Sequence, residues 1–422
     1  MGFNGQDIQK KAMPFVNWIQ KNIYLKAVMG GMMAAMPATI IGSLAALVKQ
    51  IPIPAYQTFL TSHGIDAYLQ VPINFTTNII ALIFVFCIAY SLADSFEVGG
   101  LAPGVVAMIS FLFITPIQTT TDNWGQIKGL IPMDWLGSAG IFSAIIVALI
   151  SARLFVFVVK KGWTINMPDS VPPFIKNSFA SLVPGIITSV FFVVVSAVFS
   201  QTSYGNMHAF IYGVVQRPVL HLGGSIWSML LVAVLVQLFW FFGIHGMVVL
   251  TVMIPIWMTM DTAQLSAYSV GQELPNQIGL TFYLVYTVGG TALGLAILML
   301  RAKSKRYWTL GKLAFIPAMF GITEPLIFGA PLVLNPLFAI PFIFGNVISV
   351  ALAYLATIAG IIPPMTGINA PTGTPVILQA LIAGHWQNAL FQLFLLALWV
   401  VMWYPFFRIA DKRACEEEAG AA

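Results

Sequence analysis

Charged side chains are scarce in this sequence. Asp, Glu, Lys and Arg make up 8% of its 422 residues, whereas a soluble domain carries about 25%. Hydrophobic residues make up 59%, and the mean hydropathy is +0.89. The apolar runs are long and continuous, while a membrane β-barrel would alternate apolar and polar residues in segments of about 10. The composition therefore predicts an all-α polytopic membrane protein embedded in a lipid bilayer.

Cysteine is nearly absent, and the motifs of several enzyme classes are missing. Cys87 and Cys415 are too few for a disulfide framework or a cysteine metal cluster. The three glutamates that follow Cys415 disfavour a reactive thiolate there. The chain has no GxxxxGK[ST] loop of an ATPase, no paired catalytic acids, no metal signature and no cleavable signal peptide. We therefore expect no catalytic residue, no metal and no cofactor.

Positive charge is spread over short loops, so the net charge of +5 predicts no nucleic-acid partner. The lysine-rich segments 160–176, 301–312 and 408–413 and the acidic segments 119–138 and 261–279 fall on opposite sides of the membrane. Because basic loops stay inside, both termini are predicted to be cytoplasmic. Apolar runs near the length that a bilayer needs predict ten spans, at about 25–48, 74–94, 100–118, 139–159, 180–200, 225–243, 247–260, 281–300, 346–362 and 389–408.

Composition also divides the chain into segments. Residues 1–24 form an amphipathic segment, with apolar side chains such as Ile8, Ala12 and Ile19 on one stripe, that we expect on the cytoplasmic surface. Two transmembrane domains are expected at 25–200 and 225–410. A connecting segment with a short surface helix, 201–224, joins them, and a cytoplasmic tail, 411–422, ends the chain.

The segment 313–345 contains five prolines and one charged residue, Glu324. Prolines at this spacing prevent a smooth spanning helix, and broken backbone at membrane depth survives only where protein or a wet cavity surrounds it. We therefore predict a re-entrant hairpin with Glu324 at its bend. An intramembrane carboxylate indicates a functional site; the alternative is that Glu324 caps a helix or pairs with a buried arginine.

Five further positions could contact a polar ligand. His245 lies where one span ends and the next begins, and could bind a ligand, take a proton or simply bond a backbone carbonyl. Asn369 and Thr372, in the Pro/Gly-rich segment 362–374, offer donors and acceptors, unless this is an ordinary loop. Trp240 and Trp386 could stack on a sugar ring or serve as interfacial anchors.

These candidates favour an uncharged, hydroxyl-rich solute. Charged rings that would line an ion pathway are absent from the apolar runs. A carboxylate, in contrast, accepts strong charge-assisted hydrogen bonds from sugar hydroxyls.

Two motifs resemble a known family. GITEPLIFGAPLVLNPLFAIPFI, from Gly321 to Ile343, and FWFFGIHG, which contains His245, are similar to sequences of enzyme IIC, the membrane subunit of sugar phosphotransferase systems. The LNP…AIPF half resembles the lactose/cellobiose/diacetylchitobiose family. The similarity covers nearly the whole chain.

This resemblance implies a homodimeric sugar permease of a bacterial cytoplasmic (inner) membrane, with ten spans and two re-entrant hairpins per protomer. Residues 25–200 would form the scaffold and dimer contact, and 225–410 would bind a disaccharide through Glu324 and His245. Translocation by alternating access would precede phosphorylation by a phosphocysteine on a separate IIB subunit, itself served by IIA. Thr372 stands where many relatives have a stacking Trp, which leaves the sugar open.

Two other functions are consistent with the residues themselves. A proton-coupled secondary sugar transporter would use Glu324 as its proton site, and uptake would then need a proton gradient. A membrane scaffold or sensor would transport nothing, but it would not need a broken polar hairpin at membrane depth.

Overall fold

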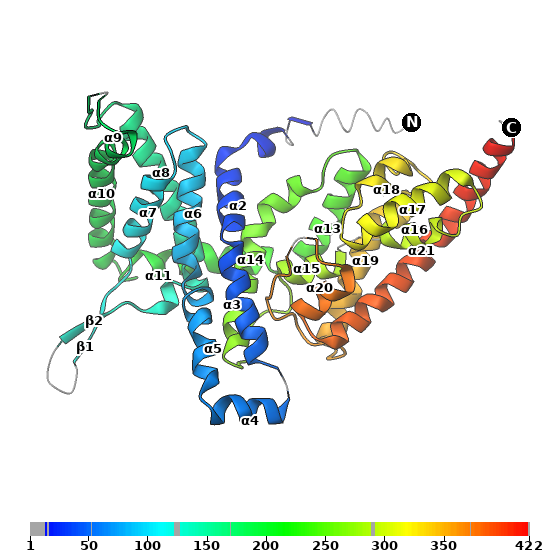
Figure 1. Cartoon of the computed structure of the whole chain (residues 1–422), viewed down its shortest axis with the longest axis horizontal. Coiled ribbons are helices and arrows are strands. Elements are labelled where there is room, and N and C mark those ends of the chain that lie inside the picture. Colours follow the sequence, from blue (N-terminus) through cyan, green and yellow to red (C-terminus); the bar gives the residue numbers. More distant parts are fainter. Residues whose placement is uncertain are drawn as a thin grey trace. The chain divides into compact units, whose positions relative to one another are not determined.

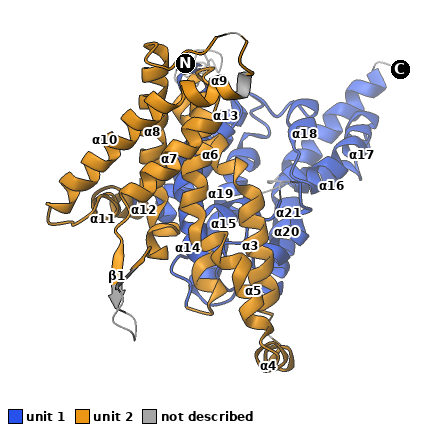
Figure 2. Cartoon of the chain, turned by 60° about the vertical axis from the view of Figure 1, so that its left-hand side comes forward, with its two compact units in different colours: residues 1–20, 222–264, 273–422 blue, residues 21–221, 265–272 orange. Residues whose placement is uncertain are grey.

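The computed structural model describes residues 13–14, 17–51, 53–121, 127–168, 170–287, 292–371 and 373–420. The chain divides into two compact units (Figure 2). Unit 1 comprises residues 1–20, 222–264 and 273–422, and unit 2 comprises residues 21–221 and 265–272. Of the predicted surface segment 1–24, residues 1–12 and 15–16 lie outside the described part.

Unit 2 is a helical bundle with one small hairpin. Its α-helices are α2 (Ile23–Ala34), α3 (Met36–Lys49), α4 (Pro54–Ser62), α5 (Ile65–Asn74), α6 (Ile80–Asp94), α7 (Leu101–Phe113), α8 (Ile141–Lys160), α9 (Pro173–Ala180), α10 (Leu182–Ser200) and α11 (Met207–Ile211). Short 3₁₀ turns are η1 (Thr77–Ile79), η2 (Met133–Trp135) and η3 (Ser138–Gly140). A π-helical turn, η4 (Tyr212–Gln216), leads into α12 (Arg217–Gly223), which crosses the boundary between the units.

The centre of unit 2 is α6, which packs against α2, α7 and α8 (Figure 1). Its residues Ile80, Phe84 and Ile88 are fully buried and recur every fourth position, as on one face of a helix. Gly31 of α2 permits close packing here, because a Cβ at that position would lie 2.5 Å from the Cα of Ile88. Small residues allow membrane helices to approach in this way.

One antiparallel hairpin interrupts the otherwise helical fold. It pairs β1 (Gln118–Thr121) with β2 (Ile127–Leu130), with Gln118 opposite Leu130. Most of this hairpin lies in the acidic segment 119–138, which the sequence predicted on the non-cytoplasmic side of the membrane.

Unit 1 contains the C-terminal helices. They are α13 (Ile226–Phe241), α14 (Met247–Ser269), α15 (Leu280–Thr287), α16 (Ala292–Met299), α17 (Lys305–Met319), α18 (Glu324–Gly329), α19 (Ala339–Ile358), α20 (Val376–Ala383) and α21 (Trp386–Gly420). The last residues of α14 belong to unit 2. Within unit 1, α13 packs on α19, and α16 packs on both α17 and α21.

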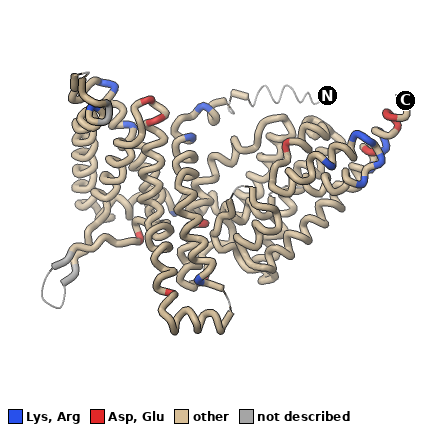
Figure 3. The backbone as a smooth tube through the Cα atoms, in the orientation of Figure 1, with Lys and Arg blue, Asp and Glu red and all other residues tan. Residues whose placement is uncertain are grey.

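The described residues confirm a helical multi-pass membrane protein. They contain seven helices that are long and apolar enough to cross a bilayer, or up to nine if two bent helix pairs each count as one span. The bent pairs are α2 with α3, at 40°, and Met207–Gly223 with α13. Long parts of the helices carry no charge (Figure 3). The count of ten is not confirmed and stays a prediction.

Two segments differ from the expected pattern. The helix α14 does not end near residue 260 but continues to Ser269, because Asp261 is 2% exposed and hydrogen-bonded rather than solvated. The predicted tail 411–422 continues α21 as helix as far as Gly420. The limits and roles of the predicted domains stay predictions.

In the segment 313–345, which was predicted to be a re-entrant hairpin, the helices are interrupted by non-helical residues. The segment comprises the end of α17, the six-residue α18 and the start of α19, with non-helical segments at 320–323 and 330–338. Pro317 lies inside α17, and Pro325 occupies the first turn of α18, where its missing N–H costs little. Pro331 and Pro336 lie in the second non-helical segment, so these two prolines coincide with an interruption.

Candidate functional site

Glu324 is the first residue of α18, directly after the first break. The chain leaves α17 at Met319 and reverses through Gly321, whose φ of +81° is a left-handed conformation that favours glycine. Pro325 then starts the short helix. The side chain of Glu324 is 44% exposed and approaches a histidine, not an arginine as in the alternative considered from the sequence.

His245 lies in the tight turn between α13 and α14. Gly243 has a φ of +73°, and a Cβ on Gly246 would come within 2.7 Å of Val236 and 2.9 Å of Trp240. The glycines of the sequence GIHG therefore let the turn fold back on α13. This places Nε2 of His245 3.8 Å from Oε1 of Glu324.

The hydrogen bonds of His245 determine which nitrogen can donate. Its Nδ1 accepts a hydrogen bond from the backbone N–H of Met247, at 3.2 Å. In the neutral ring the proton must then lie on Nε2, which faces Glu324. At 3.8 Å the two groups are too far apart for a direct hydrogen bond. A ligand hydroxyl could accept from Nε2–H and donate to the carboxylate at the same time.

Trp240 completes this cluster on the last turn of α13. Its ring centroid lies 4.3 Å from that of His245, with the planes tilted by 50°, and 6.4 Å from that of Phe328. The backbone also connects these segments, because Leu334 N–H donates to the Phe241 carbonyl at 2.9 Å. Trp240, His245 and Glu324 are therefore held together by α13, α18 and the loop that follows α18.

These three residues line one cavity of about 370 Å³ within unit 1. Several neutral polar side chains share its wall, and we did not expect them from the sequence: Gln237, Thr287, Thr323 and Asn346. Asn346 is 3% exposed, and among the described residues nothing donates to its Oδ1. Asn346 is the single side-chain amide of the apolar helix α19, and Gln237 is that of α13. A lone amide in an apolar helix is the sequence feature that could have predicted them as site residues.

Two other predicted site residues, Asn369 and Trp386, are not among the residues that line this cavity. Asn369 Nδ2 donates to Oδ2 of Asp261 at 3.3 Å, and the hydroxyl of Thr281 contacts Asn369 Oδ1 at 2.9 Å and Asp261 Oδ2 at 2.6 Å. These bonds join the segment 362–374 to α14 and α15. Trp386 begins α21 and is 63% exposed. Thr372 lies outside the described residues.

The cavity is suited to binding rather than to covalent chemistry. It offers one carboxylate, one imidazole, an indole face and several amides or hydroxyls, all of which can contact a polyol. Neither Cys87 nor Cys415 is among its lining residues. In the described part of the chain, no three His, Cys, Asp or Glu side chains gather so that they could hold a metal ion.

Comparison with known proteins identifies the family. The family model described as "Phosphotransferase system, EIIC" matches residues 29–345. The oligo-beta-mannoside-specific EIIC component of Bacillus subtilis is 34% identical over 96% of this chain and 94% of its own length. The cellobiose-specific EIIC component of Geobacillus stearothermophilus is 33% identical over 98% of this chain and 95% of its own length.

A solved structure agrees with these relatives. The transporter ChbC, the IIC component from the N,N'-diacetylchitobiose-specific phosphotransferase system, is 34% identical and superimposes with a TM-score of 0.90. The match covers 98% of this chain and 99% of that one. The resemblance seen in the two motifs is thereby confirmed, and the proton-coupled alternative receives no support. The chain belongs to the EIIC family, the sugar-permease components of the phosphotransferase system.

Proposed function

We propose that this EIIC component carries a β-linked disaccharide inward and presents it for phosphorylation. The support for this sugar class comes from relatives named for oligo-beta-mannoside, cellobiose and N,N'-diacetylchitobiose. Transport proceeds by alternating access, in which the C-terminal domain 225–410 moves the sugar and 25–200 is the scaffold and dimer contact. The protein acts as a homodimer in a bacterial cytoplasmic membrane, with both termini in the cytoplasm.

The cavity around Glu324 is the proposed sugar site. The observation that carries this proposal is the 3.8 Å approach of His245 Nε2 to Glu324 Oε1 at the wall of one cavity. One sugar hydroxyl bridges the two groups, and Trp240 packs against a ring face. Glu324 then lies beside the hydroxyl that is later phosphorylated, while Asn346 and Gln237 contact the remaining hydroxyls.

The phosphoryl group comes from another protein. The cavity wall contains no cysteine, so no side chain there can serve as a phosphocysteine. A separate IIB subunit donates the phosphoryl group, and a IIA subunit recharges IIB. Phosphorylation traps the sugar, because the charged product no longer suits a cavity of mostly neutral polar groups.

Substitution of Glu324 tests the site. Glu324→Gln keeps the volume but removes the charge, so we expect cellobiose or diacetylchitobiose binding to weaken by more than about tenfold, given that hydrogen bonds to charged groups contribute roughly 1.5–3 kcal/mol. Isothermal titration calorimetry on the purified protein measures the affinity. The matched control is Glu273→Gln, which changes an exposed carboxylate of unit 1 that does not line the cavity.

A folded Glu324→Gln variant with the affinity of the unchanged protein would remove Glu324 from the site. Weakening by Glu273→Gln to the same degree would contradict the site assignment as well, because the effect would then depend on net charge alone.

A further inference from the structure

We propose that unit 2 carries a binding site for an anionic phospholipid, in a groove along α8 between α2 and α10. The groove holds one acyl chain, and Arg153 binds the phosphate of the headgroup. This site is separate from the sugar cavity, which belongs to unit 1.

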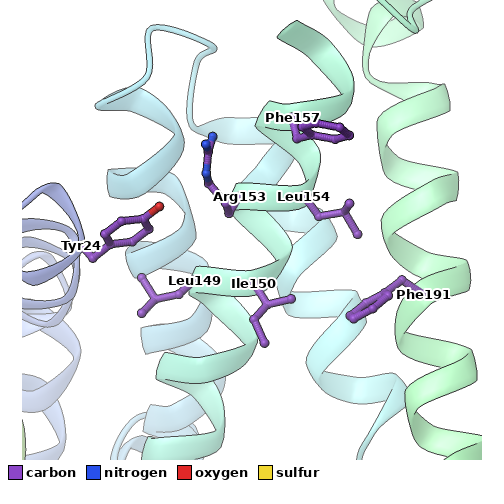
Figure 4. A pocket seen from close by; sticks show the side chains of 7 residues that line it. All are labelled: Tyr24, Leu149, Ile150, Arg153, Leu154, Phe157 and Phe191. Atoms are coloured by element: carbon purple, nitrogen blue, oxygen red, sulfur yellow. The ribbon is translucent and has the colours of Figure 1, made fainter. Parts of the chain in front are cut away.

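The groove is apolar over most of its length (Figure 4). It encloses about 560 Å³, and apart from Tyr24 and Arg153 its lining is hydrophobic: Leu149, Ile150, Leu154, Phe157 and Phe191. Ile150, Phe157 and Phe191 are 39%, 45% and 41% exposed. In a membrane protein, a helix face that displays such side chains contacts hydrocarbon or a second protein. The groove therefore matches the chemistry of an acyl chain.

Arg153 places a permanent positive charge at this apolar groove. It lies seven residues before Lys160, the last residue of α8, so it is roughly 10 Å below the end of that helix. Charged side chains at such a position are costly unless they pair or reach the interface. In the described part of the chain, no carboxylate lies within ion-pair distance of Arg153; its Cζ lies instead over the ring of Phe96, 4.8 Å from the centroid.

A second cation contacts the same ring. The Nζ of Lys160 lies 5.1 Å from the centroid of Phe96, so the same aromatic ring contacts two positively charged side chains. Asp94 and Glu97 flank Phe96 in sequence, but the structure has no ion pair of either with Arg153 or Lys160. Two cations that form no ion pair with any described carboxylate attract an anion.

These observations together specify a ligand with both a tail and a negative head. A guanidinium binds phosphate oxygens through two parallel N–H groups, and basic residues beside a span recruit anionic lipids from the adjoining leaflet. Free phosphate would leave the apolar groove unfilled, and a zwitterionic lipid would bring its own cation towards Lys160. An anionic phospholipid satisfies the groove and the charges at once.

Native mass spectrometry of the full-length protein tests this site. Phosphatidylglycerol is titrated into the detergent-solubilised protein, and lipid adducts are counted. We expect Arg153→Gln to reduce the apparent affinity by about fivefold, the effect of one basic residue near the membrane surface. The matched control is Arg217→Gln, because Arg217 also belongs to unit 2 and also lies over a ring, 5.0 Å from Tyr212, but outside the groove.

Two further experiments test the contact with the acyl chain separately from the contact with the headgroup. Ile150→Trp fills the groove and should also weaken phosphatidylglycerol binding, while inorganic phosphate at equal concentration should displace none of the lipid. The unchanged protein should bind phosphatidylcholine more weakly than phosphatidylglycerol. The Arg153→Gln variant should bind the two lipids with equal affinity.

The proposal is overturned if Arg153→Gln binds phosphatidylglycerol as the unchanged protein does, or if Arg217→Gln weakens binding just as much. It also fails if Ile150→Trp changes the oligomeric state but leaves the lipid adducts unaltered, because a protein partner would then occupy the groove. Thermal unfolding of each variant shows that a loss of lipid is not a loss of fold.

Discussion

His245 uses its two ring nitrogens for different purposes. Nδ1 accepts from the Met247 N–H within its own turn, which leaves Nε2–H directed at Glu324. An internal hydrogen bond of this kind fixes both the ring orientation and the position of the proton. The residue can therefore donate to a sugar hydroxyl without any change of charge.

This arrangement leads to a prediction for two amide substitutions. A glutamine amide reaches about as far as Nε2, whereas an asparagine amide reaches only the position of Nδ1. We expect His245→Gln to retain several times more sugar affinity than His245→Asn, since a neutral hydrogen bond contributes roughly 0.5–1.5 kcal/mol. Calorimetric titration of the two variants compares them directly. If the asparagine variant binds more tightly, the sugar is held through Nδ1 and the proposed geometry is incorrect.

Asn346 gives a second prediction at this scale, in which stability and affinity move in opposite directions. Its Oδ1 is buried and accepts nothing from the described residues. Because an unsatisfied buried polar group costs roughly 1–3 kcal/mol, Asn346→Leu should leave the melting temperature of the sugar-free protein unchanged or raised, yet weaken sugar binding. The matched control is Ser349→Ala, which removes a buried hydroxyl of α19 that is hydrogen-bonded to Trp399 and should lower the melting temperature. A sugar affinity unaffected by Asn346→Leu would exclude Asn346 from the site.

The cavity residues that could be predicted from the sequence are those that interrupt an apolar run. Glu324 and His245 lie in breaks marked by proline and glycine, so the pattern that locates the break also locates the side chain. Gln237 and Asn346 lie inside regular helices, and their position on the cavity wall depends on how α13 packs on α19. Asn369, in contrast, was predicted as a site residue but does not line the cavity. Its hydrogen bonds to Asp261 and Thr281 join segments that are far apart in sequence.

At the scale of the elements, the close packing of α16 against α21 depends on one glycine, Gly294. A Cβ at Gly294 would lie 2.7 Å from both the backbone carbon and the Cβ of Trp399, whose side chain is fully buried. The two helices can therefore approach closely only while position 294 has no side chain. Trp399 in turn donates to the Ser349 hydroxyl, so the same contact positions α19, which carries Asn346.

Replacement of this glycine should separate the helices. We expect Gly294→Ala to lower the free energy of unfolding by roughly 1–3 kcal/mol, the usual cost of overpacking, as measured by thermal unfolding in detergent. Gly185→Ala in α10 is the matched control, since the nearest atom there is 3.4 Å away and alanine favours the helix. Equal melting temperatures for the Gly294→Ala protein and the parent would show that α16 and α21 are not packed at this point.

The spans were largely predictable as apolar runs, but their ends and bends were not. Asp261 suggested the start of a loop, yet Thr281 and Asn369 satisfy the carboxylate inside the protein, so α14 continues past it. The 40° bend between α2 and α3 lies beside Pro37, in the first turn of α3, so the proline and not the hydrophobicity marks it. A search for apolar runs alone therefore misses this bend.

At the scale of the whole molecule, the proposed function makes transport and phosphorylation one process. We expect cells that produce this protein to accumulate labelled sugar, and to form its phosphate, only when the general phosphotransferase proteins are present. The panel comprises cellobiose, diacetylchitobiose, lactose and a β-mannobiose, and it ranks the substrates. The physical reason is that an alternating-access carrier without a coupled reaction only equilibrates the sugar across the membrane.

The controls for this prediction distinguish the energy source. An uncoupler that dissipates the proton gradient should leave the initial rate unchanged while phosphoenolpyruvate is plentiful. Accumulation that persists without the phosphotransferase proteins and stops with the uncoupler would contradict the proposed coupling, and would assign the driving force to protons.

The length and the anchoring of the last helix, α21, make its end a suitable position for a fluorescent label. With 35 residues, α21 is roughly 50 Å long, well beyond the hydrocarbon thickness of about 30 Å. Its final turns are anchored, because Asp411 accepts from the N–H groups of Lys303 and Ser304, and Glu418 accepts from those of Lys305 and Arg306. A fluorophore attached near residue 419 would therefore not swing on a loose tether. It would report the motion that we propose for the sugar-binding part of the chain during turnover, because the label would move rigidly with that part.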